Sequence, residues 1–301
     1  MSRVKELLLA LAGASMFAMG ASAVPLTLPY QLTHSQNMDP SFRPDDKRLV
    51  YISVIAGKEQ LLTMNADGSA PEQITHDDAN HEDPAWSPDG RKIGFVRITK
   101  DEERIYIMNP DGTAARPVSP PGTHAIHPEW SRDSSKLIYC TDDDLQLPRK
   151  NDSDIDIADL ATGKITTVLT GGVNTYPDWS PDMKYIVFRR MLGEMNSEVF
   201  IANADGSNAR NLTNHPAFDG WPAWSPDGRL IAFASNRNAR YQIFVMNPDG
   251  ADVRLVANTE GRATAPRWSP DGSAIYFTNC VAKDYGADCE ILVAKLPDSR
   301  R

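Results

Sequence analysis

Histidine and carboxylate side chains gather in a few short segments of this 301-residue chain. Asp39 and Asp83 are among the carboxylates that accompany the histidines there. Imidazole nitrogens and carboxylate oxygens together are suitable ligands for divalent ions such as Zn²⁺, Mn²⁺ or Ca²⁺. We place these segments in loops and expect any polar binding site to lie among them. The six histidines are His34, His76, His81, His124, His127 and His215.

Motifs of the common hydrolases are missing from the sequence. It contains no GxSxG nucleophile elbow and no GxxxxGK phosphate loop. The pair His81-Glu82 is not the start of an HExxH zinc motif, because Ala85 stands where the second histidine is required. A nucleophilic hydrolase is therefore not expected, and we assign no catalytic residue.

The elements that must position these side chains are encoded by a repeated sequence motif. An aromatic residue followed by Ser-Pro-Asp-Gly, or by a variant of it, recurs six times at intervals of 44 to 49 residues. A period of this size with turn residues in fixed places is typical of a β-propeller. The aromatic residues are Phe42, Trp86, Trp130, Trp179, Trp224 and Trp268.

Each repeat divides into four strands, so we predict an all-β, six-bladed propeller of four-stranded blades. Apolar residues stand seven and nine positions after each aromatic, which indicates a half-buried strand. The N-terminal segment LPYQLTHSQ matches a fourth strand, and the C-terminal EILVAKLP matches a third. The N-terminal strand therefore completes the last blade, which closes the ring and protects its edges.

A proline precedes every aromatic by two positions, and the residue before that proline differs from copy to copy. If this position lines the channel mouth, Asp39, Asp83 and His127 present metal ligands from neighbouring blades. Tyr176 and Trp221 then form a wall on which a sugar or a peptide could stack. The sixth copy has Ala265, and His81 joins the predicted ligand-binding funnel. The alternative is that these are ordinary solvated loop residues, since surface loops are polar.

The first 23 residues read as a secretory signal peptide. Arg3 and Lys5 precede a short apolar stretch, and Ala21-Ser22-Ala23 forms a small-residue cleavage site. Residues 24–301 then form one propeller domain, exported to the periplasm and without a transmembrane anchor after cleavage. The net charge of −9 and the lack of a basic run argue against a nucleic-acid partner. We expect a monomer.

The three cysteines suit an oxidising compartment. Cys280 and Cys289 flank one hairpin loop, across which a local disulfide is predicted. Cys140 ends a strand pattern, and we expect it to be a buried thiol.

The WSPDG unit, its upstream proline and the downstream Asp-Gly turn resemble the repeats of TolB-type propellers. The resemblance covers residues 30–297. It implies a propeller that docks partner proteins in the cell envelope. TolB carries an α/β domain before its propeller, for which we expect no room here. Related repeats also form the propellers of prolyl-oligopeptidase relatives and of some polysaccharide lyases, so the resemblance specifies architecture more closely than function.

Two hypotheses follow. In the first, the protein is a TolB-like periplasmic binding or scaffold protein, which presents its variable loops to an envelope protein, a peptide or a glycan. In the alternative, it is a metal-dependent polysaccharide lyase or hydrolase. That enzyme would use the histidine and aspartate cluster at the channel mouth, with calcium, manganese or zinc as its metal.

Overall fold

The computed structural model describes residues 29–34, 36–45, 47–141, 152–193, 196–281 and 288–297, and this part of the chain contains 24 strands and no helix. The predicted signal peptide lies outside the described residues. No helix in the described ranges is therefore long and apolar enough to cross a membrane.

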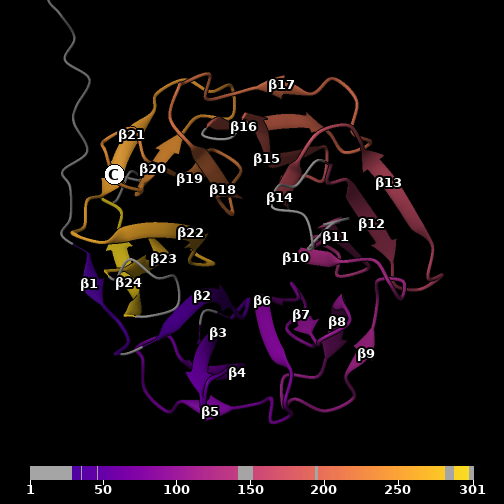
Figure 1. Ribbon diagram of the computed structural model, residues 1–301. Helices are drawn as coiled ribbons and strands as arrows, with labels where there is room; N and C mark the ends of the chain where they lie inside the picture. Colours follow the sequence, from indigo (N-terminus) through magenta and orange to yellow (C-terminus); the bar gives the residue numbers. More distant parts are fainter. Residues whose placement is uncertain are drawn as a thin grey trace, which may run out of the picture.

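The strands form six four-stranded antiparallel sheets arranged as a ring (Figure 1), which confirms the predicted propeller. The inner strands are β2 (Asn37–Phe42), β6 (Asn80–Trp86), β10 (Ala125–Trp130), β14 (Asn174–Trp179), β18 (Asp219–Trp224) and β22 (Arg262–Trp268). The second strands are β3 (Arg48–Ile55), β7 (Ile93–Ile98), β11 (Lys136–Thr141), β15 (Tyr185–Gly193), β19 (Ile231–Ser235) and β23 (Ala274–Cys280). The third strands are β4 (Lys58–Asn65), β8 (Glu103–Met108), β12 (Ile155–Asp159), β16 (Asn196–Asn203), β20 (Gln242–Met246) and β24 (Cys289–Lys295). The outer strands are β5 (Glu72–Gln73), β9 (Arg116–Pro117), β13 (Ile165–Leu169), β17 (Arg210–Asn211), β21 (Arg254–Ala257) and β1 (Tyr30–Gln31). We number the blades 1 to 6 in the order of their inner strands.

Blade 6 is closed by the N-terminal strand, as predicted. Strand β1 pairs with β24, with Tyr30 opposite Val293 (Figure 1). The buried Thr33 extends the contact, because its hydroxyl donates to Glu290 and accepts the amide hydrogen of Ile291. Strands from the two ends of the chain therefore share one sheet, and its outer edge is covered.

The second strands supply the core between the blades. The two apolar positions predicted on each of them are buried in all six copies, for example Ile93 and Phe95 in blade 2. Each such side chain contributes roughly 1.5–3 kcal/mol relative to an exposed position. The repeat aromatics pack between blades, and the indole nitrogens of Trp130 and Trp268 donate to backbone carbonyls of the preceding blade.

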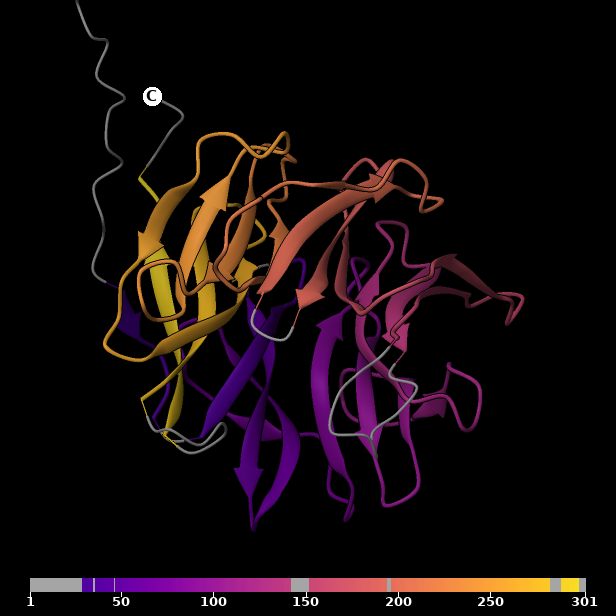
Figure 2. The same cartoon turned by 45° about the horizontal axis from the view of Figure 1, so that its top comes forward.

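The connections lie at two opposite ends of the strands (Figure 2). One face, which we call the turn face, carries the Ser-Pro-Asp-Gly and Asn-x-Asp-Gly turns. In five copies the serine hydroxyl donates to the turn aspartate, as Ser87 does to Asp89 at 2.7 Å. The same hydroxyl accepts the amide hydrogen five residues later, which is Lys92 in that copy. These carboxylates therefore serve the turns as hydrogen-bond acceptors.

Every inner strand is interrupted at the residue that precedes its proline. The register with the second strand shifts there in all six blades. Each of these residues has a φ of 47° to 55°, although none is glycine. A bulge of this kind turns a side chain away from the face it would otherwise occupy. Proline suits the interruption because it has no N–H to leave unpaired.

Candidate functional site

The six bulge residues converge on one cavity of about 390 Å³, which we call the axial cavity. It opens on the face opposite the turns, where the variable loops lie. All six therefore line the channel mouth, including five of the residues predicted for the ligand-binding funnel. They are Asp39, Asp83, His127, Tyr176, Trp221 and Ala265.

Neighbouring bulge residues contact one another around half of the ring. Asp83 Oδ2 accepts the amide hydrogen of His127 at 3.2 Å, and the imidazole Nε2 lies 3.7 Å from the same oxygen. The His127 and Tyr176 ring centres are 3.7 Å apart, and Tyr176 is 5.3 Å from Trp221. On the other side, Asp39 is held by the hydroxyl of Thr278. The repeated bulge thus places four of the six side chains, from Asp83 to Trp221, in one contiguous row along the rim.

His81 does not belong to this rim. It is only 3% exposed, and its imidazole Nε2 lies 3.3 Å from Asp77 Oδ1. Its ring packs near Phe95, and burial lowers its pKa. The expectation that all histidines occupy loops was wrong for His81, in β6, and for His127, in β10. A residue two positions before the bulge faces the sheet rather than the axis.

Carboxylates on the blade 1 and blade 2 side of the cavity resist ionisation. Burial raises the pKa of Asp83 to about 7, and the charge of Asp39 adds to the effect. The pKa of Asp39 is raised by the same loss of water. The pKa of Glu82 is raised to about 10 by burial and by its hydrogen bond to Glu59. Clusters of perturbed carboxyls in a cleft are a common mark of functional sites.

The predicted metal ligands are not assembled into a coordination group. Asp39, Asp83 and His127 all line the cavity. In the described part of the chain, however, no set of three or more His, Cys, Asp or Glu side chains is arranged to hold a metal ion. His127 points its Nδ1 at the thiol of Cys140, 3.2 Å away, and not at the cavity carboxylates. Metal binding by these three residues stays a prediction.

Cys140, His127 and Asp83 have the order of a thiol, imidazole and carboxylate catalytic group. The thiol is fully buried and outside any disulfide, as predicted. A nucleophile needs access to its substrate, and this thiol has none in the structure. The predicted disulfide between Cys280 and Cys289 is present, directly across β23 and β24.

An ion pair forms the floor of the axial cavity. Glu129 in blade 3 and Arg267 in blade 6 meet across the ring at 2.6 Å. Both residues line the axial cavity and also a second cavity of about 430 Å³ on the turn face. The channel is therefore divided in two by this pair. Arg267 has a raised pKa because Glu129, Asp178 and other carboxylates outweigh its burial.

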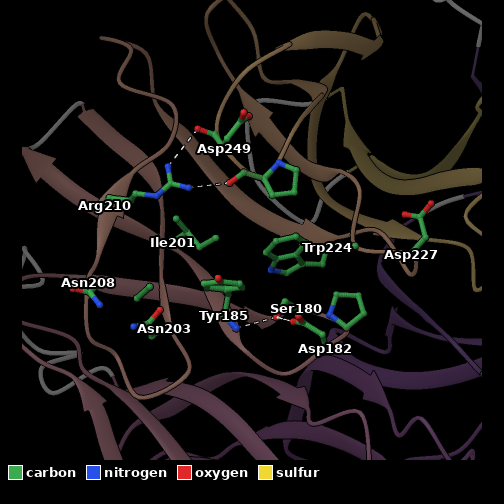
Figure 3. Close-up of a pocket in the computed structure, with 14 residues that line it drawn as sticks. Ser180, Asp182, Tyr185, Ile201, Asn203, Asn208, Arg210, Trp224, Asp227 and Asp249 are labelled. Carbon is green, nitrogen blue, oxygen red and sulfur yellow. Dashed lines mark hydrogen bonds between the residues drawn. The ribbon is translucent and has the colours of Figure 1, made fainter.

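Another cavity, of about 620 Å³, lies between blades 4 and 5 on the turn face (Figure 3). Most of its polar groups are already engaged: Arg210 donates to the carbonyls of Pro248 and Asp249, and Asp182 accepts from Ser180. The axial cavity, where dissimilar side chains converge, is the stronger candidate site.

Two arginines near the rim were not predicted from the sequence as candidate site residues. Arg262 lines the axial cavity, and Arg189 contacts the rings of Tyr176 and Trp221. Both lie within strands, where a single arginine looks like an ordinary solvent-facing residue. The available signal was positional: Arg189 stands where the other five blades have Ile, Val, Cys, Ala or Thr.

Comparison with known proteins agrees with this architecture. The sequence matches the family described as TolB beta propeller domain over residues 31–147 and 146–296. The chain belongs to the TolB β-propeller domain family. A TolB homologue of Chlorobium chlorochromatii (strain CaD3) is 33% identical over 81 residues, which is 27% of this chain and 18% of that relative. The match thus spans less than a fifth of the relative.

Solved structures show how widely the fold is shared. A putative TolB from Agrobacterium tumefaciens superimposes with a TM-score of 0.65 at 23% identity, covering 87% of this chain and 90% of that one. A gluconolactonase from Xanthomonas campestris gives 0.68 at 14% identity, covering 92% and 98%. Similarity at this level of identity concerns the fold alone, which serves binding proteins and enzymes alike.

Proposed function

We propose that this protein is an exported, periplasmic TolB-like binding protein that holds a segment of an envelope protein in its axial cavity. One observation carries the proposal. The backbone bulge repeats in all six blades, and there the side chains of five different residue types meet at one cavity. Backbone in the left-handed region costs about 1–3 kcal/mol per bulky residue, and such strain is typical of functional sites.

The cavity suits binding better than turnover. Its carboxylates are not grouped around a metal position among the described residues, and the thiol near His127 is buried. Membership of the TolB β-propeller domain family supports a docking role. No observation favours the lyase or hydrolase alternative over this one.

The test is to fill the cavity without disturbing the frame. Ala265→Trp places in blade 6 the residue that blade 5 already carries at the equivalent bulge, where Trp221 has a φ of 52° and Ala265 one of 49°. The matched control is Ala114→Trp, an exposed alanine of the turn face whose φ is 54°. Both variants should fold.

Each protein is used to capture partners from periplasmic extract, with thermal unfolding as a check on folding. We expect wild type and Ala114→Trp to retain one specific envelope protein and Ala265→Trp to lose it. Capture that survives in Ala265→Trp would contradict the proposal. Retention of a saccharide and no protein would return the enzyme alternative to first place.

A further inference from the structure

Three carboxylates, Asp39, Glu82 and Asp83, line the axial cavity from blades 1 and 2. No lysine or arginine of the described residues forms an ion pair with any of them. Asp39 accepts a hydrogen bond from the hydroxyl of Thr278 at 3.0 Å, and Asp83 accepts the amide hydrogen of His127 at 3.2 Å. The His127 imidazole lies 3.7 Å from Asp83 and compensates its charge only when protonated. This side of the cavity is therefore acidic and held mainly by neutral donors.

The two arginines of the cavity are engaged with other residues. Arg267 pairs with Glu129 at 2.6 Å and forms the floor. Arg262 lies on aromatic rings, with its Cζ 4.7 Å from the ring centre of Tyr241 and 5.9 Å from that of Trp221. Both arginines belong to β22 in blade 6. The positive charge of the cavity thus comes from one blade, and the acidic side of blades 1 and 2 keeps its negative charge.

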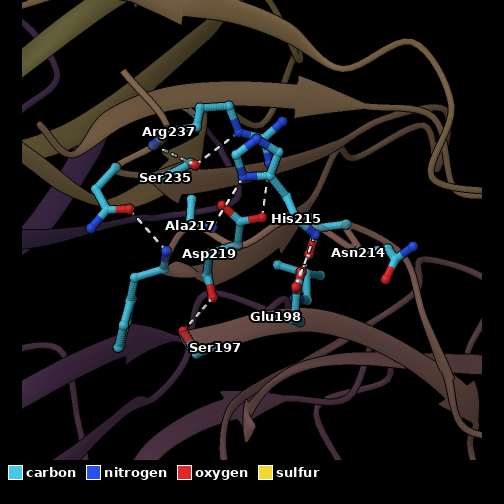
Figure 4. Close-up of polar contacts among 12 residues, drawn as sticks. Ser197, Glu198, Asn214, His215, Ala217, Asp219, Ser235 and Arg237 are labelled. Atoms are coloured by element: carbon cyan, nitrogen blue, oxygen red, sulfur yellow. Dashed lines mark hydrogen bonds and ion pairs between the residues drawn. The ribbon is translucent and has the colours of Figure 1, made fainter. Parts of the chain in front are cut away.

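Blade 5 shows how the same fold neutralises a buried aspartate. Asp219 is fully buried in β18, and the guanidinium of Arg237 donates to its Oδ2 at 2.8 Å (Figure 4). The Ser235 hydroxyl accepts from Nε of the same guanidinium at 2.9 Å and fixes its orientation. Withdrawing a carboxylate from water costs several kcal/mol, so buried aspartates are normally paired in this way. Among the described residues, Asp39 and Asp83 have no arginine in the equivalent role.

The acidic side chains repel one another but do not meet at a single metal position. Burial and mutual repulsion raise the pKa of Glu82 and Asp83, with Asp39 among the charges that repel them. Within the described ranges, no group of three such side chains is arranged to hold a metal ion. A guanidinium is larger than a metal ion and carries five N–H donors in one plane, so it can reach carboxylates that lie apart. The arrangement therefore suits a polyatomic cation.

The aromatic row beside the acidic side suits the apolar stem of such a cation. The rings of His127 and Tyr176 are 3.7 Å apart, Trp221 follows 5.3 Å from Tyr176, and all three line the cavity. The methylene groups of an arginine can pack along these rings while its charged head reaches the carboxylates. The cavity volume of about 390 Å³ lies within the range of roughly 300–1,000 Å³ that is typical of ligand pockets.

We propose that the axial cavity binds an arginine side chain of its docking segment, with the guanidinium between Asp39 and Asp83 and the stem along the aromatic row. The guanidinium then gives both aspartates the partner that Arg237 gives Asp219. Hydrogen bonds between a guanidinium and a carboxylate are about twice as strong as those between neutral groups. The occupant is therefore a basic segment of an envelope protein. This inference rests on the proposed function and names the chemistry of its ligand.

The experiment is isothermal titration of the wild-type chain at low salt, with EDTA present, using three probes. The first is the acetylated, amidated peptide Gly-Ser-Arg-Ser-Gly. The second has citrulline in place of arginine, which keeps the shape and removes the charge, and the third is spermidine, a free polyamine. The titration is run at pH 8, above the pKa of about 7 of Asp83. We expect the arginine peptide to bind at least about tenfold more tightly than the citrulline peptide, a difference of about 1.4 kcal/mol.

Three matched aspartate variants assign the effect to residues. Asp39→Asn and Asp83→Asn should each weaken binding of the arginine peptide about tenfold. Asp78→Asn removes the same charge from the exposed loop that precedes β6 and should change nothing. Both cavity variants should fold, because asparagine keeps an oxygen acceptor for the Thr278 hydroxyl or the His127 amide. Thermal unfolding checks the fold of each variant before titration.

The outcomes separate this inference from the proposed function. Equal binding of the arginine and citrulline peptides, no binding at millimolar concentration, or full binding by either folded cavity variant overturns it. Tighter binding of spermidine than of the arginine peptide overturns the peptide occupant. If partner capture depends on Ala265 but not on Asp39 and Asp83, the docking function stands and the arginine-binding site fails. If binding of the arginine peptide needs the two aspartates while Ala265→Trp captures normally, the arginine-binding site stands and the docking function fails.

Discussion

Asp133 in the turn of blade 3 and Asp83 in the axial cavity show how differently the two faces treat one residue type. Asp133 accepts hydrogen bonds from the hydroxyls of Ser131 and Ser135 and from the Ser135 amide, and these lower its pKa to about 2. Asp83 is buried beside Asp39, and its pKa rises to about 7. The turn face stabilises its charges, whereas the cavity face holds charges that destabilise the fold.

This difference separates the frame from the site. The turn networks recur in five blades, and the Asn-x-Asp-Gly turns pack against the neighbouring blade with little freedom to vary. The bulge positions recur in geometry but not in residue type. The backbone conformation thus repeats on both faces, whereas the residue types repeat only on the turn face. Changes to the frame should alter stability alone, and changes to the cavity should alter pH dependence and binding.

The largest expected effect comes from opening the frame. A chain that begins at residue 35 lacks β1 and the contacts of Thr33 with Glu290 and Ile291. Strand β24 then becomes an open edge, so we expect global loss of stability or aggregation. Thermal unfolding measures the loss, and a synthetic peptide of residues 24–34 added in trans should restore part of it. An unchanged melting temperature would show that the ring does not depend on this closure.

The next-largest effect is the loss of stability expected when a glycine of the turn face is replaced. Gly206 has a φ of 82°, and a Cβ there would lie 1.7 Å from the carbonyl oxygen of Val168, in the outer strand β13 of the neighbouring blade 3. Gly206→Ala should cost about 3 kcal/mol or more, because backbone strain and a backbone clash add. Gly163 has a φ of 72° with nothing near its Cβ, so Gly163→Ala should cost only about 1 kcal/mol. Urea unfolding compares the two, and equal losses would mean that the close approach is relieved without cost.

The third prediction concerns the cavity and its pH dependence. The native pKa of Asp83 lies above its unfolded value, so the native state binds more protons between about pH 4 and 7, and its stability falls as the pH rises through that range. Asp83→Asn should therefore raise stability at pH 8 by about 1 kcal/mol, or about 2 to 4 °C in Tm, after allowing for partial exposure. The wild type and the variant both carry His81, so its lowered pKa cancels in the comparison, and the useful window runs from about pH 4 to pH 8.

Matched melting curves for wild type and Asp83→Asn across that window provide the measurement. The variant should show a flatter slope and leave the disulfide and the fold intact. Parallel slopes would mean that Asp83 ionises as easily in the native protein as in the unfolded chain.

The fold could be predicted because its determinants are local and repeated. Phe42 and the five repeat tryptophans, with their prolines and turns, specify the blades, and the terminal segments reveal how β1 completes blade 6. The bulge itself was not predicted, although Pro84 and its equivalents stand where the register breaks. The sequence does not show which way each side chain points. His81 and Asp83 lie two residues apart, yet His81 is buried in the sheet and Asp83 lines the cavity.

The close approach of Arg189 to Gly220 could not be predicted, because it is a contact between neighbouring blades. Arg189 is 31 residues from Gly220 in the sequence, and only the ring brings the arginine stem over the glycine. The same holds for Glu129 and Arg267, which meet across the channel from opposite blades. Comparing the six copies position by position could have singled out Arg189 and Gly220 as exceptions, but not that they touch.

The smallest expected effect tests the turn face at a single hydroxyl. Ser131→Ala removes the bond to Asp133 at 2.6 Å and the acceptor of the Lys136 amide at 2.9 Å, which should cost about 1 kcal/mol at pH 7. The pKa of Asp133 should rise from about 2 toward its usual value. A carboxyl with a depressed native pKa stabilises the fold above its unfolded pKa and loses that contribution as pH falls, so the difference between wild type and variant should shrink from pH 7 to pH 2. Titration of Asp133 by NMR, with urea unfolding at both ends of that range, measures the two effects. A constant difference would mean that the hydroxyl acts on the backbone turn alone, and the contrast with Asp83 would then reflect burial and not the hydrogen bonds of the turn.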